Sequence, residues 1–450
     1  MASGHDLDHL FLPSSVAVYG ASTRDTTKLG NSLLRNALNS DMSEIVAVSP
    51  NAGTVEGLST VPSLGQPVDL ALISVPDRAV EAAIDDAASA GARCAVILTS
   101  GFGETGEEGK AVERRIVNRA SATGMRVQGP NCMGVVSHLG DDSWLNGSYF
   151  WKINLTPGQI SVLSQSGAFG GMFFAQLAAR GLGFRRFASL GNSADLDETD
   201  MLEWLAQDDA TEVVGLFAEA ISGGRRFVEV VRAITPTKPV VVLKSGRSVA
   251  GTRAAASHTG SIAGGHGAVS AALRRAGAIE THTSDEFFDV LTAVASPQRG
   301  LRSPRVAVVT ISGGPSVLAA DEAERLGLEL PALSESTVAR LRQVIPGFAA
   351  TGNPVDLTPQ CALDAYAPAV DAVFDDSNID GVIAINCGLD VAPFGSAVAA
   401  ASQRTGKPTV GFVTDAPTVT ALLAEVGIPQ FSSPERAAAG IAALSGGMIT

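Results

Sequence analysis

Residues 16–48 read VAVYGASTRDTTKLGNSLLRNALNSDMSEIVAV, and this stretch contains every element of a repeating α/β unit. Residues 16–19 and 45–48 are short apolar runs of the length expected for buried strands, and residues 29–39 have the pattern of a helix. A turn of small residues, 20–22, follows the first run directly. A strand, a turn, a helix and a second strand in this order predict a parallel sheet with helices on both faces.

The same alternation continues to residue 128. The expected strands are residues 69–75, 94–98 and 125–128, and the expected helices are residues 77–90 and 107–123. Ligands of such sheets bind at the carboxyl ends of the strands. Those ends carry turns of small residues, namely GAS at 20–22, SPN at 49–51, SVP at 74–76, TSGF at 99–102 and GPNC at 129–132.

These turns predict a nucleotide-type site for an adenine-containing ligand. Small residues let backbone N–H groups approach a phosphate, and the helix that follows adds partial positive charge. Ordinary tight turns are the structural alternative. A nicotinamide cofactor is disfavoured, because Gly20 has no glycine two residues later and the GxGxxG fingerprint is incomplete.

A second set of strands and helices begins after residues 137–158, a turn-rich stretch that we interpret as a connection. The expected strands are residues 159–163, 184–189, 213–217 and 239–243, and the expected helices are residues 168–180, 196–206, 227–234, 267–275 and 284–295. The strand ends carry SQSG at 164–167, Gly191-Asn192 and Glu219. This pattern predicts a second parallel sheet of flavodoxin-like size.

The last of these strands leads into residues 244–265, KSGRSVAGTRAAASHTGSIAGG. The stretch is rich in Gly, Ser, Ala and Thr and has almost no bulky apolar side chain that could hold it on a core. Loops of this length in compact α/β domains are usually functional or disordered. His258 stands near the middle, so the stretch is either a mobile arm that presents an imidazole or a surface linker with an incidental histidine.

A polar linker, residues 298–304, leads to a third unit. Its expected strands are residues 305–311, 381–385 and 409–413, and its expected helices are residues 316–326, 392–402, 417–425 and 434–444. It opens with SGGP at 312–315 after an apolar strand, and GNPVD at 352–356 is a turn signal. We find no acid–base pair here and expect a scaffold and interface. The predicted domains are residues 1–140, 141–298 and 299–450.

Composition narrows the classes of function. The 450 residues are 45% hydrophobic and 17% charged, with a formal net charge of −14, which disfavours a nucleic-acid or anionic-membrane partner. No apolar run is long enough to span a membrane, and the N-terminus does not resemble a signal peptide. Four scattered cysteines and six histidines without an HExxH motif predict a reduced cytoplasmic protein without a metal site. His5 and His9 lie in a polar tail that we expect to be frayed.

The residues at the second set of strand ends fit a phosphohistidine relay. A neutral imidazole can attack phosphorus, and a carboxylate such as Glu219 can fix the tautomer of His258 through the other ring nitrogen. The phosphorylated ring would carry a dianion, for which the amides of Ser166, Gly167 and Ala168 at a helix start are suitable donors. The hypothesis requires that Glu219 and His258 meet in space.

Several motifs together resemble a known family. They are SHTG at 257–260, SQSG at 164–167, Gly191-Asn192 with Asp195, GPNCMG at 129–134 and GNPVD at 352–356. The chain resembles, from about residue 10 to residue 444, the α subunit of the NDP-forming acyl-CoA synthetases, which include ADP-forming acetyl-CoA synthetase and, more distantly, succinyl-CoA synthetase. The resemblance implies a CoA-binding Rossmann domain followed by two flavodoxin-like ligase domains.

The resemblance also implies roles for individual residues. His258 would be the transiently phosphorylated residue, Glu219 the carboxylate beside it, and the start of the SQSG helix the phosphate site. The residues implied to hold CoA are Gly20, Ala21, Ser22, Lys28, Ser74, Pro76 and Asn131. The family often has a Lys or Arg after the Asn-Pro that ends the second strand, whereas this chain has SPNA at 49–52, which leaves Lys28 and Arg24 as candidates for that contact.

The reaction implied by the resemblance has three steps: phosphate displaces CoA from an acyl-CoA, the phosphoryl group passes to His258, and ADP or GDP accepts it. We find no region that resembles an ATP-grasp domain, which holds the nucleotide and Mg²⁺ in this family. The resemblance therefore implies that this part is on a separate ATP-grasp β chain or is missing. We expect an α2β2 hetero-oligomer or an α dimer alone. The acid itself is not readable from the sequence.

Two other classes of function stay open at this stage. One is a CoA-binding or acyl-CoA-sensing protein of the same fold without ligase turnover, although a bare binder gains nothing from His258 and Glu219. The other is a nicotinamide-dependent oxidoreductase, against which the incomplete fingerprint argues. Cys132 stands near the expected thiol end of CoA, where a small packed residue is the favoured interpretation.

Overall fold

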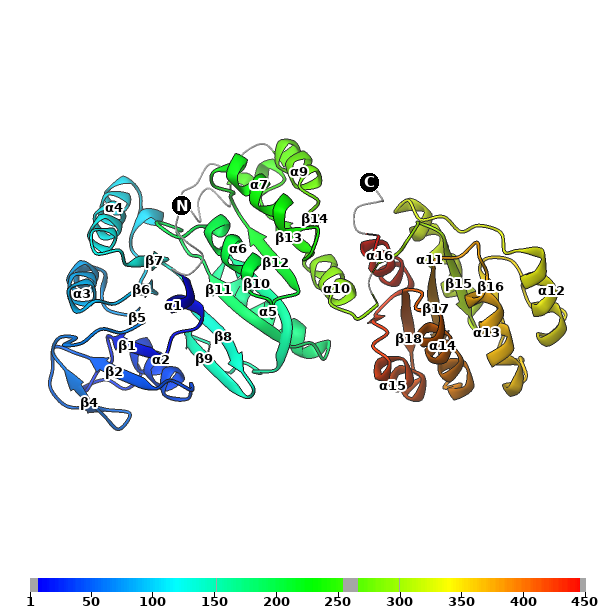
Figure 1. The fold of residues 1–450 in the computed structure, drawn as a ribbon, viewed down its shortest axis with the longest axis horizontal. Helices are drawn as coiled ribbons and strands as arrows, with labels where there is room; N and C mark the ends of the chain where they lie inside the picture. The colour runs from blue at the N-terminus through cyan, green and yellow to red at the C-terminus, as the bar shows by residue number, and fades with distance from the viewer. Residues whose placement is uncertain (1–6, 151, 254–265, 299, 446–450) are drawn as a thin grey trace. The chain divides into compact units, whose positions relative to one another are not determined.

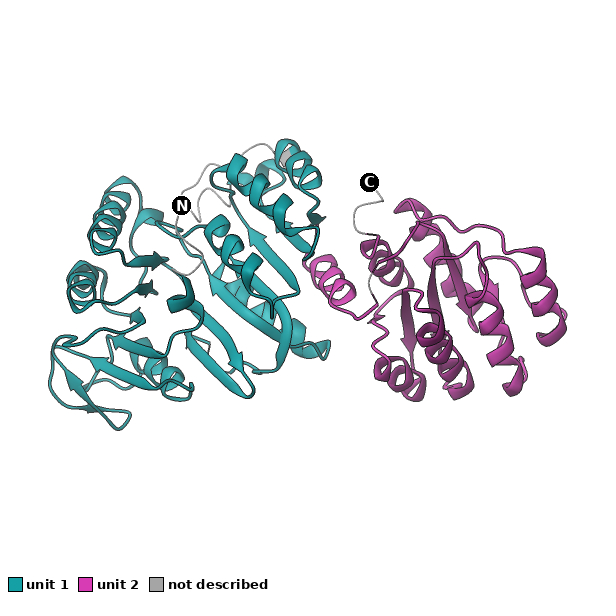
Figure 2. Cartoon of the chain, in the orientation of Figure 1, with its two compact units in different colours: residues 1–280 teal, residues 281–450 magenta. Residues whose placement is uncertain are grey.

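The computed structural model describes residues 7–150, 152–253, 266–298 and 300–445. The chain divides into two compact units, Met1–Glu280 and Thr281–Thr450 (Figure 2). Unit 1 contains two sheets and unit 2 contains one, with helices packed on each (Figure 1). The α/β class expected from the sequence is confirmed, while the domain boundaries at residues 140 and 298 stay predictions.

The first sheet of unit 1 has the strand order β3-β4-β2-β1-β5-β6-β7. All neighbouring strands are parallel except β3, which runs antiparallel to β4. Its strands are β1 (Ser15–Tyr19), β2 (Glu44–Val48), β3 (Thr54–Val55), β4 (Leu58–Val61), β5 (Leu70–Ile73), β6 (Cys94–Ile97) and β7 (Arg126–Gln128), and its helices are α2 (Leu29–Leu38), α3 (Asp77–Ala90) and α4 (Glu107–Ser121).

Helices on both faces explain why β1 is apolar at successive positions. Val16 and Val18 belong to the same hydrophobic core as Leu33 of α2, while Ala17 belongs to a second core with Val80 of α3. Strands that are covered on both faces become continuous hydrophobic runs rather than alternating ones. The carboxyl ends of the strands, and the turns that follow them, therefore share one edge of this sheet.

The second sheet of unit 1 has the order β14-β13-β12-β10-β11-β8-β9. Its strands are β8 (Gly134–Gly140), β9 (Ser143–Ser148), β10 (Pro157–Ser164), β11 (Phe184–Ser189), β12 (Val213–Ala218), β13 (Val240–Lys244) and β14 (Ile279–Thr281), and the helices between them are α5 (Gly167–Ala179), α6 (Glu198–Gln207), α7 (Gly224–Ile234) and α9 (His266–Arg275). Strands β10 to β13 are parallel, as expected.

The stretch from 137 to 158 is not the connection that we expected. It contributes most of the hairpin β8–β9, which extends the second sheet through an antiparallel pairing of β8 with β11. The prediction was wrong because the hairpin buries polar residues that are typical of loops. Asn146 and Ser148 are 8% and 0% exposed, and the Ser148 hydroxyl donates to Asn146 Oδ1 over 2.6 Å.

The described part of the N-terminal segment, from Leu7, is also folded where we expected a frayed tail. Residues 1–6, with His5, lie outside the described part of the chain, but α1 (Asp8–Phe11) packs on unit 1. Phe11 is fully buried, with its ring stacked 4.4 Å from that of Trp204, whose indole N–H donates to Asp8. His9 contacts Asp69 over 2.8 Å. These partners lie far along the chain, so a local pattern could not reveal them.

Unit 2 is built on one parallel sheet with the order β16-β15-β17-β18-β19. Its elements are α10 (Ser284–Val294), β15 (Val306–Thr310), α11 (Gly313–Arg325), α12 (Glu335–Val344), β16 (Val355–Asp356), α13 (Tyr366–Phe374), β17 (Gly381–Cys387), α14 (Ala392–Thr405), β18 (Thr409–Thr414), α15 (Pro417–Glu425), β19 (Gln430–Phe431) and α16 (Pro434–Ala443), with short 3₁₀ turns at Gly103–Thr105 in unit 1 and Leu363–Ala365 here.

The GNPVD motif of unit 2 has a structural role. Its Asn353 accepts a hydrogen bond from Val308 N–H over 3.0 Å and donates to the Val306 carbonyl over 2.8 Å, so its side chain ties the motif to β15. The motif at 312–315 lies at the start of α11, which begins at Gly313 rather than at residue 316. The GNPVD motif thus fixes local backbone in this unit.

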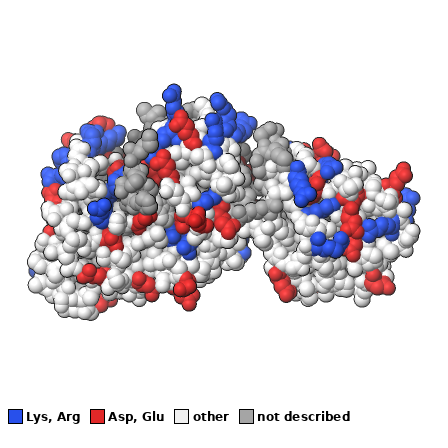
Figure 3. All heavy atoms as spheres, viewed as in Figure 1, with Lys and Arg blue, Asp and Glu red and all other residues white. Residues whose placement is uncertain are grey.

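On the face drawn in Figure 3, acidic and basic side chains intermingle rather than gathering into one basic area. None of the helices in the described ranges is both long and apolar enough to cross a membrane.

Candidate functional site

A cavity of about 1070 Å³ opens within unit 1, where the turns of the first sheet face the start of α5. Ten of the residues predicted from the sequence line it together: Gly20, Ala21, Ser22, Lys28, Ser74, Pro76, Asn131, Ser166, Gly167 and Ala168. The turns for which the sequence predicted a nucleotide-type site and the helix start for which it predicted a phosphate site therefore line one cavity. The sequence left two candidates for the basic side chain that would contact a CoA phosphate. Lys28 lines the cavity, and Arg24 is not among the lining residues.

The turn after β1 requires glycine at two positions. Gly20 has a φ of +103°, and a Cβ there would lie 2.0 Å from the Ser74 carbonyl oxygen. A Cβ at Gly30 would lie 2.3 Å from the Gly20 carbonyl oxygen. The start of α2 can therefore pack directly against the turn, and Leu29 and Gly30 at that start line the cavity.

Asn31 holds this turn in shape. Its side chain is fully buried, and it accepts from Ser22 N–H over 2.8 Å and donates to the Ser22 carbonyl over 3.0 Å. The Ser22 hydroxyl in turn accepts from the backbone N–H of Asp25. Sequence reasoning did not identify Asn31, although its place in the first turn of the helix after a Gly-Ala-Ser turn is a usable signal.

The potential at both helix starts favours an anion. Neither α2 nor α5 carries an acidic residue in its first turn, so the positive end of each helix dipole is not neutralised locally. Ser166 caps α5, with its side chain accepting from Phe169 N–H. Lys28, which precedes α2, adds a formal positive charge to the same cavity.

Another part of the cavity lining belongs to a hydrogen-bond network that the sequence did not reveal. Asn131, in the left-handed region with a φ of +59°, donates to Asn192 Oδ1 over 3.2 Å. The Asn192 amide donates to Glu104 and to Glu113, each over 2.6 Å. Burial acts to raise the pKa of Glu104. The pKa is nevertheless lowered, because Gly101 N–H and the Asn192 amide donate hydrogen bonds to the carboxylate. The ionised Glu104 lines the cavity and is already hydrogen-bonded.

Cys132 and Tyr149 close the cavity beside α5. Burial raises the pKa of the Cys132 thiol to about 12, so at neutral pH the group is a packed thiol rather than a nucleophile. Burial also raises the pKa of Tyr149 to about 12, and its hydroxyl lies 2.7 Å from the Ser74 hydroxyl. The favoured sequence interpretation of Cys132 as a packed residue agrees with this environment.

Glu219 follows β12 directly and is 8% exposed. Its backbone is fixed by two side chains: Gln165 Oε1 accepts from Glu219 N–H over 2.6 Å, and Lys244 Nζ donates to the Glu219 carbonyl over 2.7 Å. Burial lowers the pKa of Lys244, and the charge of Glu219 opposes this effect. Glu219 is not among the lining residues of the cavity, and His258 lies outside the described residues, so their predicted pairing stays a prediction.

Glu198 is a further buried carboxyl group near Glu219. It is fully buried, and burial raises its pKa to about 7. It accepts from Ser222 N–H over 2.7 Å and from the Gln165 amide over 3.2 Å. Gln165 therefore connects Glu198 to the backbone of Glu219.

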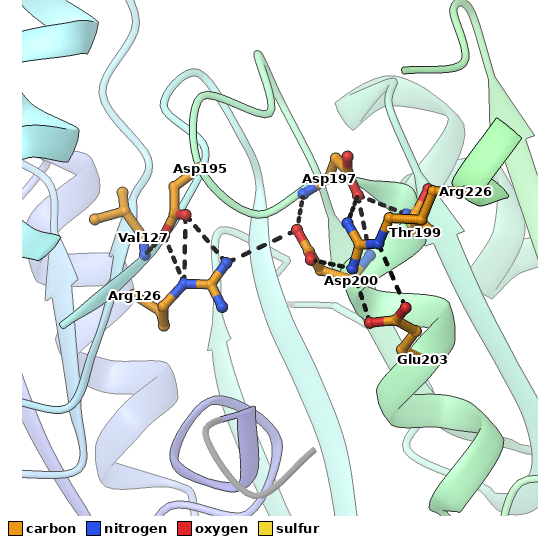
Figure 4. Close-up of polar contacts among 8 residues, drawn as sticks. All are labelled: Arg126, Val127, Asp195, Asp197, Thr199, Asp200, Glu203 and Arg226. Carbon is orange, nitrogen blue, oxygen red and sulfur yellow. Dashed lines mark hydrogen bonds and ion pairs between the residues drawn. The ribbon is translucent and has the colours of Figure 1, made fainter. Parts of the chain in front are cut away.

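Ion pairs connect the first sheet to helices of the second (Figure 4). Arg126 of β7 makes a bidentate contact with Asp195, with both N···O distances at 3.0 Å, and Asp195 also accepts from Val127 N–H. Asp197 and Asp200 form a capping box at the start of α6. Arg226 donates to Asp200 and Glu203, each over 2.7 Å. The contact of Arg126 with Asp195 thus links the two sheets, whereas the pairs of Arg226 link α6 to α7.

No group of three His, Cys, Asp or Glu side chains in the described ranges is arranged to hold a metal ion.

The chain matches three family models in order. Residues 14–138 match a CoA binding domain, residues 157–294 match a succinyl-CoA ligase like flavodoxin domain, and residues 306–430 match a ligase-CoA domain. The α subunit of ADP-forming acetate–CoA ligase II from Pyrococcus furiosus is 36% identical over 453 residues, which cover 97% of each chain.

Two further similarities extend this comparison. ADP-forming acetate–CoA ligase I from Archaeoglobus fulgidus is 34% identical over 97% of this chain but only 63% of its own length. The solved structure of acetyl-coenzyme A synthetase 1 from Ca. Korarchaeum cryptofilum, in complex with phosphate and ADP, has a TM-score of 0.88 and 32% identity, covering 98% of this chain and 96% of that one.

A CoA-binding domain joined to two ligase domains is the architecture of an acid–thiol ligase subunit. The chain belongs to the family of α subunits of the ADP-forming acyl-CoA synthetases. The resemblance that the sequence motifs indicated is thereby confirmed.

Proposed function

We propose that the cavity of unit 1 is where this α subunit interconverts acyl-CoA and phosphate with an acyl phosphate and CoA, before a partner chain completes ATP formation. One observation carries this proposal: the turns after the first-sheet strands and the start of α5 line the same cavity. A thioester held along the turns would therefore present its carbonyl carbon to an anion held at α5. Such proximity and orientation can supply a large part of a rate enhancement.

CoA would be held by Gly20, Ala21 and Ser22 at the start of α2, with Lys28 near its phosphates. Ser74, Pro76 and Asn131 would line the path to the thiol end. The close packing of Gly20 and Gly30 supports this assignment, because it brings the start of α2, where Leu29 and Gly30 line the cavity, against the turn.

Phosphate would be held at Ser166, Gly167 and Ala168. Its oxygen attacks the thioester carbonyl carbon, the C–S bond breaks, and the thiolate of CoA takes up a proton. The acyl phosphate remains at the start of α5, where backbone N–H groups stabilise the charge on its phosphoryl oxygens.

His258 would then take the phosphoryl group. A neutral ring nitrogen attacks phosphorus, the bond from phosphorus to the acyl oxygen breaks, and the carboxylate leaves. Glu219 would hold the other ring nitrogen, and the contacts of its backbone with Gln165 and Lys244 support that role, because a positioned carboxylate must itself be fixed.

ADP would accept the phosphoryl group at a site on a partner chain. The P. furiosus relative is named as an α subunit, and the A. fulgidus relative extends well beyond the match. We propose an ATP-grasp β chain that binds the nucleotide and Mg²⁺, an α2β2 assembly and a cytoplasmic location.

The test is to purify the chain with its partner and supply labelled ATP. Wild type should acquire an acid-labile, base-stable label, and adding an acid and CoA should discharge it as acyl-CoA forms. His258→Ala should acquire none, while the matched control His282→Ala, at an exposed histidine of unit 2, should label normally. Label that persists in His258→Ala would contradict the assignment, and CoA binding without labelling in any form would favour a binding protein.

A further inference from the structure

A second cavity, of about 500 Å³, adjoins the one already described. Met133 and Tyr149 line both cavities, so these two side chains form the boundary between them. The residues behind the boundary are mainly apolar and include Phe150, Gly171, Phe174 and Ala175. Since the second cavity adjoins the proposed thioester site, what that site holds constrains which ligand the second cavity can bind.

The space exists because one face of α5 carries small residues beside large rings. Phe150 packs edge-on against Phe174, with ring centroids 5.3 Å apart. A Cβ at Gly171 would lie 3.7 Å from Phe150, an ordinary contact distance, so a larger side chain at this position would occupy the cavity. Ala175 lies one turn further along the same helix.

The boundary residues lie beside the atoms that react in the proposed mechanism. A Cβ at Gly167, in the proposed phosphate site, would lie 2.5 Å from Met133 Cγ. On the other side, the Tyr149 hydroxyl contacts Ser74, on the proposed path of CoA. Tyr149 N–H donates to the Met133 carbonyl over 3.0 Å, which keeps the pair together. An acyl group that extends from the carbonyl carbon therefore meets this boundary first.

We propose that the second cavity binds the apolar part of an acyl group larger than acetyl, so that this chain accepts medium-length or aryl acids. The inference rests on the proposed function, because it assumes that the thioester lies in the first cavity. The volume is within the usual range for small-molecule sites and has room for on the order of ten non-hydrogen atoms. Met133 is a flexible side chain that can move aside for a longer chain.

The test is calorimetric titration of the full-length chain with CoA, acetyl-CoA, butanoyl-CoA, hexanoyl-CoA and octanoyl-CoA. Each buried methylene should tighten binding about fourfold until the cavity is filled. Ala175→Phe should abolish this gain and leave the affinity for CoA within about twofold of wild type. Ala179→Phe, the same change on an exposed residue of α5 outside the cavity, should keep the gain.

Ala178→Leu, a smaller addition at a lining residue, should shorten the chain length at which the gain stops. Equal affinities for all chain lengths in wild type, with CoA still bound, would overturn this inference alone. A gain that survives Ala175→Phe would also overturn it. If CoA and its thioesters all fail to bind, the proposed function is overturned and this inference with it.

Discussion

Gly20 lies so close to Ser74 that a Cβ at residue 20 would be 2.0 Å from the Ser74 carbonyl oxygen. Gly20 also has a φ of +103°, which disfavours any other residue. We predict that Gly20→Ala lowers the free energy of unfolding by at least about 2 kcal/mol, because conformational strain adds to the clash. CoA affinity should fall by at least tenfold, since the start of α2 must shift.

The control for this substitution is Gly57→Ala. Gly57 also has a positive φ, of +86°, but a Cβ there would meet nothing within 4 Å. Gly57→Ala should lower the free energy of unfolding by only about 1 kcal/mol and leave CoA binding unchanged. Chemical denaturation and CoA calorimetry measure both effects, and equal losses in the two variants would contradict the role given to the Gly20–Ser74 contact.

Asn31→Ala removes both hydrogen bonds that hold the backbone of Ser22. We expect a loss of about 2 kcal/mol in stability, because buried backbone groups lose their partner, and a roughly tenfold weaker affinity for CoA. Asn39→Ala, at an exposed residue just after the other end of α2, is the matched control and should change neither quantity measurably. Normal CoA binding by Asn31→Ala would show that the turn does not depend on this side chain.

Arg126→Met removes the bidentate contact with Asp195 between the two sheets of unit 1. Both side chains are 19% exposed, and the carboxylate would be left partly buried without its cation, so we expect a loss of about 2 kcal/mol. Arg115→Met breaks a pair with Glu81 in which the arginine side chain is 51% exposed. That variant should unfold like wild type, because exposed pairs contribute little. Indistinguishable melting curves for the two variants would contradict the prediction.

Glu198 makes stability depend on pH. In the folded protein, burial raises the pKa of the Glu198 carboxyl group to about 7. Between pH ~4.5 and ~7 the folded protein therefore binds more protons than the unfolded chain. The free energy of unfolding should therefore fall as pH rises through this window, and Glu198 should contribute about 3 kcal/mol of this loss. Above pH ~7 Glu198 should cause no further change.

The measurement is the free energy of unfolding of wild type and Glu198→Gln from pH 4 to pH 8. The difference between the two proteins should carry the slope, because the variant cannot titrate at residue 198. Glu229→Gln, at an exposed glutamate of α7, should follow wild type. A difference that is constant with pH would show that Glu198 titrates normally.

The sequence predicted those parts of the site that are local in the chain. Turns such as Gly20–Ala21–Ser22 follow apolar strands directly, and the carboxyl ends of parallel strands share one edge of a sheet. The order of the elements therefore predicted that these turns would meet in one cavity. The start of α5 could be predicted for the same reason, since SQSG follows a strand and opens a helix.

The remaining parts depend on contacts between distant residues. Asn192 reaches Glu104 across 88 positions, and Gln165 meets Glu198 across 33, so no local spacing marks either pair. The hairpin β8–β9 escaped prediction because Asn146 and Ser148 are loop-like residues whose polarity is satisfied inside the fold. The boundary formed by Met133 and Tyr149 could not be predicted either, because it depends on how that hairpin packs against α5.

The most direct test of the account is the crystal structure of this chain with CoA and inorganic phosphate. We predict the CoA pyrophosphate against Ala21 and Ser22 in the turn before α2, the thiol beside Cys132 and phosphate on the N–H groups of Gly167 and Ala168. CoA bound elsewhere on the chain, or phosphate absent from α5 at saturating concentration, would contradict it.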